Sequence, residues 1–327
     1  MAKTSGRTRG RRAAARLAAA AVAAALVGTG ATAFAADNPT PSASTSAKAS
    51  VKAAAAKAAA HAAAKGAAVR HGVTKADGDP NGAYPVFPLV GVDRSGNSYA
   101  YLPDFEGGFS PRMPLDEGQG GVKNGAQVDN DADGAVDGSW KWDAKGTMTY
   151  EPYAELENTT VGGGWNIYNT LLSPGNLGGA GAGDLLGRDS SGTLWLYLGY
   201  GNGTLTSRYK VGGGWGQYTA LAGNGDLTGD GKADIVARGG DGTLWLYKGT
   251  GNYKAPFEPR TKIGGGWNIF NALVSSGDVD LDGTTDLLGR DAAGALWLYK
   301  GTGSAAAPYK PRVKIGNGGW NTYRLLF

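Results

Sequence analysis

The sequence lacks cysteine and has only two histidines among its 327 residues, His61 and His71. Both histidines precede residues 77–327, so that segment contains no thiol and no imidazole. Ser-His-Asp and Cys-His nucleophile systems, and thiolate or imidazole metal sites, are therefore excluded from it. Without disulfides, the segment must be held together by core packing, by its topology or by a metal bound through oxygen.

Long hydrophobic runs are also scarce, and the one near the N-terminus predicts export. A basic stretch at residues 3–16 precedes an apolar run at residues 17–27, and residues 33–35 (AFA) have the small-x-small form of a cleavage site. The run is too short and too rich in alanine for a comfortable membrane span. We expect residues 1–35 to be a secretory signal peptide, and the mature protein to be secreted, extracellular and without a stable membrane anchor.

An excess of positive charge is absent from the mature chain. The formal net charge falls from +4 to −2 without residues 1–35, which carry six cations and no anion. Residues 36–76 carry six cations against one anion, in a Pro/Ser-rich and then an Ala/Lys-rich stretch. We expect this linker to be a solvated spacer, partly helical, because it has no apolar stripe to bury. Residues 77–327 are acidic, so no nucleic-acid partner is expected.

Residues 77–327 repeat with a period of about 50 residues. Three repeats carry a GGGW motif followed thirty residues later by LWLY, and a fourth GGW motif lies near the C-terminus. The tryptophans of the glycine-rich motif are Trp165, Trp215, Trp267 and Trp320, and those of LWLY are Trp195, Trp245 and Trp297. With two more divergent units upstream, the chain contains five repeats.

Each repeat consists of short apolar strands separated by turns, which predicts an all-β fold. The LWLY strand is apolar on both alternate faces, as expected for a strand buried on both sides. Four-stranded antiparallel sheets stacked around an axis meet this need, so we predict a five-bladed β-propeller. The last segment, GGWNTYRLLF, lacks a following loop and is expected to supply the inner strand of the first blade. An open β-solenoid or a fragment of a larger ring is the alternative.

Three loops share the pattern D-x-[DT]-x-D-G-x-x-D, which places several like charges close together. Oxygen ligands at positions one, three, five and nine, with a backbone carbonyl at position seven, suit Ca²⁺. This predicts about three structural calcium sites. The predicted ligands are Asp129, Asp131, Asp133, Ala135 and Asp137; Asp226, Thr228, Asp230, Lys232 and Asp234; and Asp278, Asp280, Asp282, Thr284 and Asp286.

A metal-free explanation also exists, since Asp and Gly favour turns on their own. Three such loops in register with the repeat favour calcium over this alternative. The loop from Asn176 to Asp184 has lost the acids at positions three and five, and is expected to hold no metal. The loop that begins at Asp77 has Pro85 at position nine, and is expected to bind metal weakly or not at all.

These loops resemble those of the FG-GAP/VCBS repeat family, the calcium-loop propeller blades also found in integrin α chains. The resemblance covers residues 77–327, and it implies that the D-x-D-x-D-G-x-x-D loop joins the inner strand to the next one and binds structural Ca²⁺. The five units depart from the seven blades usual in integrins. The GGW motifs are similar to those of tachylectin-type five-bladed lectins, which bind N-acetylated sugars.

The sequence favours a non-catalytic module that binds glycans or other cell-surface ligands. Trp165, Trp215, Trp267 and Trp320 are the candidate ligand-binding residues, because aromatic rings stack on sugar faces, although these rings could instead fill the gaps between blades. A protein-binding adhesive or regulatory propeller is the alternative. An enzyme acting on polysaccharides is a further alternative, and its candidate residues are Glu106, Arg112, Asp116 and Glu117.

Overall fold

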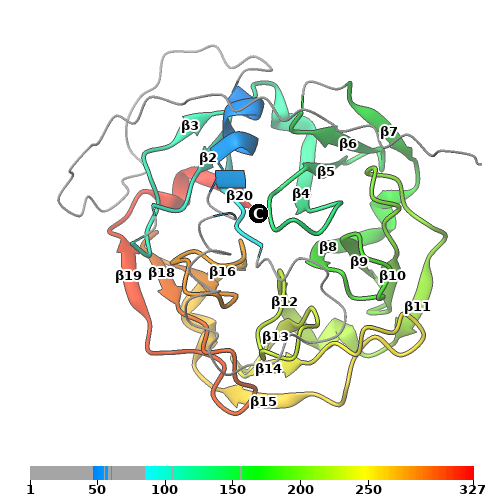
Figure 1. Ribbon diagram of the computed structural model, residues 1–327, viewed down its shortest axis with the longest axis vertical. Helices are drawn as coiled ribbons and strands as arrows, with labels where there is room; N and C mark the ends of the chain where they lie inside the picture. Colours follow the sequence, from blue (N-terminus) through cyan, green and yellow to red (C-terminus); the bar gives the residue numbers. More distant parts are fainter. Residues whose placement is uncertain (1–46, 55, 58–59, 61–84, 105, 155–156) are drawn as a thin grey trace, which may run out of the picture. The chain divides into compact units, whose positions relative to one another are not determined.

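The computed structural model describes residues 47–54, 56–57, 60, 85–104, 106–154 and 157–327, all within one compact unit, Thr32–Phe327. The predicted signal peptide and the degenerate loop that begins at Asp77 lie outside the described residues, apart from Pro85. The described strands form five antiparallel sheets of four strands each, arranged around a common axis as a five-bladed β-propeller (Figure 1). The predicted fold class is therefore confirmed.

Four blades are each built from consecutive strands, and the first strand of each lies next to the axis (Figure 1). Blade 2 contains β4 (Val122–Val128), β5 (Gly138–Asp143), β6 (Met148–Pro152) and β7 (Thr159–Gly162). Blade 3 contains β8 (Tyr168–Gly175), β9 (Asp184–Asp189), β10 (Leu194–Tyr197) and β11 (Tyr209–Gly212). Blade 4 contains β12 (Tyr218–Ala222), β13 (Ile235–Gly239), β14 (Leu244–Tyr247) and β15 (Thr261–Gly264). Blade 5 contains β16 (Phe270–Val274), β17 (Leu287–Asp291), β18 (Leu296–Tyr299) and β19 (Val313–Gly316).

Blade 1 combines the two ends of the propeller sequence, in the strand order β20-β1-β2-β3. Its strands are β20 (Tyr323–Leu326), β1 (Leu89–Asp93), β2 (Ser98–Tyr101) and β3 (Met113–Pro114). The backbones of Val90 and Phe327 exchange two hydrogen bonds, at 2.8 and 3.0 Å. The C-terminal strand thus closes the ring as predicted, without any covalent link.

The core is divided among the five gaps between neighbouring blades. One cluster lies between blades 4 and 5, where Leu244 and Leu246 meet Trp267, Phe270 and Leu287. Three-residue 3-10 helices precede the inner strands, namely Gln119–Gly121, Trp165–Ile167, Trp215–Gln217, Trp267–Ile269 and Trp320–Thr322. Because the inner strands of blades 2 to 5 start at such a helix and end at an aspartate loop, the two sets of connections lie at opposite ends of these blades.

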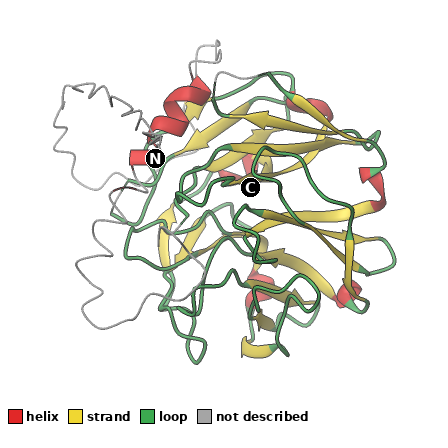
Figure 2. Cartoon of the chain, turned by 45° about the vertical axis from the view of Figure 1, so that its right-hand side comes forward, coloured by secondary structure: helices red, strands yellow, loops and turns green. Residues whose placement is uncertain are grey.

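The linker departs from its expected structure. Residues 47–54 and 56–57 are helical as predicted, but this helix lies against the propeller instead of standing free in solvent (Figures 1 and 2). Val51 is fully buried among blade residues that include Phe87, Val136 and Phe327. The prediction of a solvated helix was wrong because one valine and two lysines on one helical face suffice for docking. Among the described helices, none is long and apolar enough to cross a membrane.

Candidate functional site

The aspartate loops share a backbone geometry that the sequence pattern only partly revealed. In every described loop the residue at position four has a positive φ, at Ala132 (60°), Gly179 (87°), Gly229 (79°) and Leu281 (57°). The glycine at position six is also left-handed, for example at Gly283 (89°). Non-glycine residues rarely adopt this conformation. Its appearance at both Ala132 and Leu281 indicates that the surrounding loop imposes it.

The aspartates at positions one and nine accept hydrogen bonds from backbone amides. In the third acidic loop, Asp278 accepts from Gly283 N–H at 2.8 Å, and Asp286 accepts from Val279 N–H at 2.9 Å and Gly301 N–H at 2.7 Å. Asp286 therefore ties its own loop to the segment after β18. These bonds hold the carboxylates in place and orient their remaining oxygens.

The carboxylates of two loops converge closely enough to share a cation. Oxygens of Asp278, Asp280 and Asp286 all lie within 4.8 Å of one another, and so do those of Asp129, Asp131 and Asp137. Asp278 and Asp286 are at most 1% exposed. Hard oxygen donors at this spacing are the ligand set that Ca²⁺ prefers.

The residues at position three of the aspartate loops give a second indication of a cation site. Asp280 Oδ1 is buried and has no hydrogen-bond partner. Thr228 Oγ1, at the same position of the loop 226–234, is also buried and makes no hydrogen bond of normal geometry. A buried oxygen without a partner is costly. A bound cation would satisfy both atoms, so the residues present fit Ca²⁺.

The metal-free loops disfavour charge on their acids. Burial, with repulsion from Asp282 and Asp280 as a smaller cause, raises the pKa of Asp278 to about 7. Burial likewise raises the pKa of Asp129 and of Asp234 to about 7, and that of Asp286 well above its ordinary value. A divalent cation among these oxygens would stabilise the charged forms instead.

The ligands predicted at positions five and seven lie differently from expectation. Asp133, Asp230 and Asp282 are outside the converging carboxylate groups found among the described residues. Asp230 pairs instead with Lys248 at 3.4 Å, and Asp282 with Lys310 at 3.0 Å. At position seven, the amides of Ala135 and Lys232 donate to the acid at position five, and Thr284 does so through its hydroxyl.

The degenerate loop 176–184 keeps the shape without the charge. Asp184 is fully buried and accepts from the amides of Leu177, Gly178 and Gly199 at 2.7–3.0 Å. Burial raises its pKa to about 6, and no neighbouring acid contributes. The loop thus closes through hydrogen bonds from backbone amides to the side chains of Asp184 and Asn176. That it holds no metal stays a prediction.

The four candidate ligand-binding tryptophans lie in the core. Trp165, Trp215 and Trp267 are 6–7% exposed and Trp320 is fully buried. Each indole packs on a tyrosine ring from the third strand of a blade, counted from the axis. The ring centres of Trp267 and Tyr299, for example, lie 4.4 Å apart. Their position contradicts the expectation that these rings offer a free face to a sugar. Packing between blades outweighs the openness that three neighbouring glycines suggested.

The LWLY tryptophans are the more accessible set, against expectation. Trp195, Trp245 and Trp297 are only partly buried, and an arginine guanidinium covers each ring at 4.0–4.5 Å. Sequence reasoning missed these arginines, Arg208, Arg260 and Arg312, although they recur at the same place in the repeat. It also missed Arg188, Arg238 and Arg290, which donate to two backbone carbonyls of the next blade.

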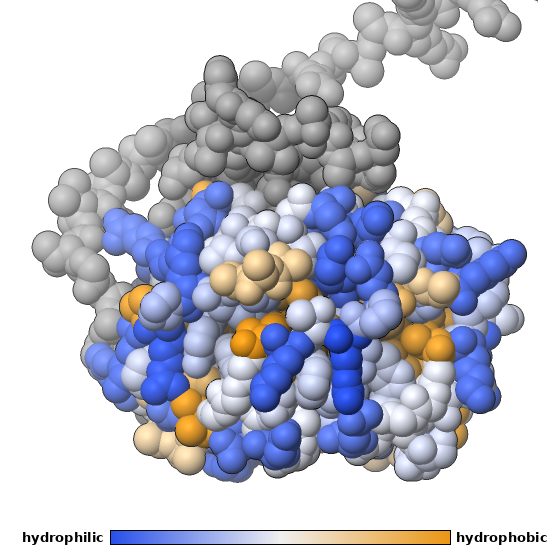
Figure 3. Space-filling view, turned by 90° about the horizontal axis from the view of Figure 1, so that it is seen from below, coloured by the Kyte–Doolittle hydropathy of each residue, from blue (hydrophilic) through white to orange (hydrophobic). Residues whose placement is uncertain are grey.

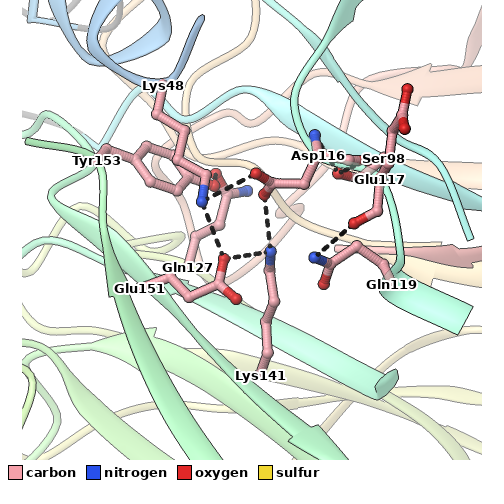
Figure 4. Close-up of polar contacts among 9 residues, drawn as sticks. All are labelled: Lys48, Ser98, Asp116, Glu117, Gln119, Gln127, Lys141, Glu151 and Tyr153. Carbon is pink, nitrogen blue, oxygen red and sulfur yellow. Dashed lines mark hydrogen bonds and ion pairs between the residues drawn. The ribbon is translucent and has the colours of Figure 1, made fainter. Parts of the chain in front are cut away.

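The candidate catalytic residues of the segment 104–121 do not form an acid pair. Asp116 lies between two ammonium groups, 3.0 Å from Lys48 Nζ and 3.3 Å from Lys141 Nζ (Figure 4). Glu117 is exposed, and the Arg112 guanidinium stacks on Tyr99 at 4.5 Å. Glu151, absent from the sequence-based set, is the second acid of this cluster, 2.5 Å from Lys141 Nζ.

Comparisons with known proteins agree with this architecture. A family model described as FG-GAP-like repeat matches residues 226–289, which includes two of the acidic loops. The chain is therefore a β-propeller in which residues 226–289 match an FG-GAP-like repeat, and the predicted resemblance is confirmed for those residues. Among curated proteins, none matches the chain.

Several solved structures are similar. They include an Agrocybe aegerita lectin that recognises non-reducing terminal N-acetylglucosamine, at 17% identity and a TM-score of 0.40, covering 74% of this chain and 65% of that one. The BP39L lectin of Burkholderia pseudomallei is 12% identical, with a TM-score of 0.44 and coverage of 69% and 68%. A mutant of AofleA from Arthrobotrys oligospora is 10% identical, with a TM-score of 0.43 and coverage of 76% and 77%.

Proposed function

We propose that this protein is a secreted, calcium-stabilised β-propeller that acts as a non-catalytic module binding glycans or other cell-surface ligands. The observation that carries the calcium part is the convergence of Asp278, Asp280 and Asp286, together with the partnerless Asp280 Oδ1. One ion would be held by these three acids, a second by Asp129, Asp131 and Asp137 in blade 2, and a third by Asp226, Thr228 and Asp234 in blade 4. When bound, it supplies positive charge that offsets the repulsion among the carboxylates.

The ligand surface is assigned to the end of the blades that carries the GGGW turns. Adding a Cβ to Gly163, Gly213 or Gly265 would meet nothing within 4 Å, so these turns leave open space above the backbone. Asn268 and Ile269 follow one of these turns. The Asn268 side chain is exposed, and that of Ile269 is 46% exposed. Amide groups beside small apolar surfaces are what the hydroxyls and ring faces of a sugar require.

The outer surface supports a binding role that relies on small contacts. On the rim shown in Figure 3, hydrophilic residues form ridges and apolar residues appear as small separate patches. The large exposed apolar side chains among the described residues are Ile167, Tyr200, Tyr209, Ile269 and Val313. Small scattered patches favour hydrophilic ligands such as glycans over a broad apolar protein interface.

The first test is thermal unfolding of the full chain in excess Ca²⁺ and in chelator. Calcium that binds only the folded state adds about 2.7 kcal/mol per site at a hundredfold excess over the dissociation constant. We expect a clear rise in melting temperature with Ca²⁺, and none with Mg²⁺ at the same concentration. Identical melting with Ca²⁺ and with chelator would remove the metal from the proposal.

The second test is a glycan array probed with the full chain in Ca²⁺. Asn268→Ala and Ile269→Ser should weaken binding without changing the melting temperature, because both side chains are exposed. Lys254→Ala, an exposed change in the segment after β14 at the opposite, aspartate-loop end of the blades, is the matched control. A blank array together with selective capture of one protein would favour the alternative of a protein-binding propeller.

A further inference from the structure

The residue that follows the third strand of a blade matches the charge of that blade's aspartate loop. In blade 5, Lys300 Nζ lies 2.8 Å from Asp280, and in blade 4, Lys248 Nζ lies 3.4 Å from Asp230. Blade 3, whose loop lacks acids at positions three and five, has Leu198 at this place. A Cβ added to Gly178 would lie 2.3 Å from Leu198 Cδ2, so the leucine reaches the loop as the lysines do. In blades 3 to 5, a lysine therefore follows the third strand only where the aspartate loop is acidic.

Blade 2 breaks this rule within its own sequence. Its loop 129–137 is acidic, but the residue that follows β6 is Tyr153, and Glu151 within β6 adds a further negative charge. The missing cations come from the linker helix. Lys52 Nζ lies 2.6 Å from Asp137 Oδ1, and Lys48 Nζ lies 3.3 Å from Glu151 Oε2. The linker thus supplies to blade 2 the lysines that blades 4 and 5 carry in their own sequences.

Apolar contacts also hold the linker helix against the propeller, on the face that carries the two lysines. Lys48, Val51 and Lys52 are spaced three and four residues apart, so their side chains lie on one side of the helix. Val51 is fully buried. About one turn further on, Ala56 packs against a small cluster that contains Ala135 and Leu281. Docking therefore involves burial of apolar surface as well as charge.

The helix completes a neutral buried cluster. Lys48 and Lys141 face Asp116 and Glu151, and all four side chains are at most 18% exposed (Figure 4). Without Lys48, one lysine would remain with two carboxylates. Leaving an uncompensated charge in a buried cluster is strongly unfavourable. The surface between blades 1 and 2 is thus complementary to a helix that carries Lys-x-x-Val-Lys.

We propose that the helix of residues 47–54 and 56–57 is a releasable strap, and that a divalent cation in the loop 129–137 competes with Lys52 for Asp137 and loosens the strap. The proposal rests on the calcium site proposed above, because Asp137 belongs to the carboxylate group of Asp129 and Asp131. By linkage, the docked strap weakens cation binding at this loop as much as the cation weakens docking. The loops of blades 4 and 5 lack this control, since their lysines are on the blade itself.

The test uses the absence of cysteine. Ala53→Cys on the strap and Glu117→Cys on the propeller, both exposed positions, give two labelling sites in the full chain. Spin labels there should report one narrow distance distribution in chelator and a broad, longer one in excess Ca²⁺. Adding Lys48→Ala and Lys52→Ala should broaden the distribution even in chelator. Lys57→Ala, an exposed lysine of the same helix, is the matched control and should leave it narrow.

Three outcomes decide between the proposals. A distribution that stays narrow in Ca²⁺ while the melting temperature rises would overturn the competition and leave the calcium sites standing. No effect of Ca²⁺ on either readout would overturn both. A narrow distribution in chelator for the double lysine variant would overturn the strap itself, whatever calcium does.

Discussion

Two gaps between neighbouring blades are filled by different chemistry. One lies between blades 4 and 5, and the other between blades 1 and 2. Between blades 4 and 5, Trp267 and Phe270 fill the space, and the Arg238 guanidinium donates to the backbone carbonyls of both residues. Between blades 1 and 2, the position of the tryptophan is held by Gln119, and a lysine-carboxylate cluster lies nearby.

The difference shows that residues outside the repeats can complete the packing between two blades. The aromatic gap is complete within the repeated units, because every residue of its cluster lies in blades 4 and 5 or in their connecting loops. The charged gap is complete only with the linker helix, which contributes Val51 and Lys48. If the strap is released as proposed, this gap opens without unfolding of the ring.

The largest expected effect is at the aromatic gap. Trp267→Ala should lower the free energy of unfolding by about 3–5 kcal/mol, because it leaves a cavity between two blades. Trp297→Ala, in the partly exposed set, should cost clearly less. Chemical denaturation of both variants measures the two changes. Equal costs would contradict the distinction between the buried and the arginine-covered tryptophans.

The next effect compares an acidic loop with the degenerate one. Asp286→Asn and Asp184→Asn both alter a buried acid at position nine that accepts backbone hydrogen bonds. Only Asp286→Asn should also remove a share of the calcium-dependent stabilisation, about 2.7 kcal/mol at a hundredfold excess of Ca²⁺. Melting in Ca²⁺ and in chelator separates the two. A calcium-dependent loss of the same size in both variants would contradict the assignment.

A pH series sharpens the same comparison. Burial raises the pKa of Asp129, Asp234 and Asp278 to about 7 from an ordinary 3.8. In chelator, the folded protein therefore holds protons that the unfolded chain releases, and this stability is lost as the pH rises through about 7. Melting temperatures should fall between pH 5.5 and 8 in chelator, by about 2–4 °C for each kcal/mol lost. In Ca²⁺ the fall should vanish, and a fall of equal size would argue against metal ligation.

The smallest effect is expected at the exposed ion pair of blade 5. Lys310 is half exposed and lies 3.0 Å from Asp282, so Lys310→Ala should change stability by less than about 1 kcal/mol. Lys52→Ala, at the better-buried Asp137, should change it more. Melting of both variants in chelator measures this difference. A larger loss at Lys310 would contradict the view that the strap contact is the more important of the two.

The repeat allowed much of the fold to be predicted from local patterns. The 50-residue period, the LWLY strands and the final unpaired segment predicted five blades and the closing strand, because each is a matter of spacing along the chain. The aspartate loops were located for the same reason. The left-handed conformation at position four was not predicted, because Ala132 and Leu281 occupy it in two loops, where the loop enforces a conformation that these residues disfavour.

What the sequence by itself determined is the set of repeated contacts, since residues that recur at equal spacing occupy equivalent places in successive blades. Only the tertiary structure decided which tryptophans are buried, because burial depends on the neighbouring blade and not on the strand that carries the ring. It also decided where Lys48 and Lys52 lie. A contact between residues 85 or more positions apart, such as that of Lys52 with Asp137, leaves no local periodicity to read.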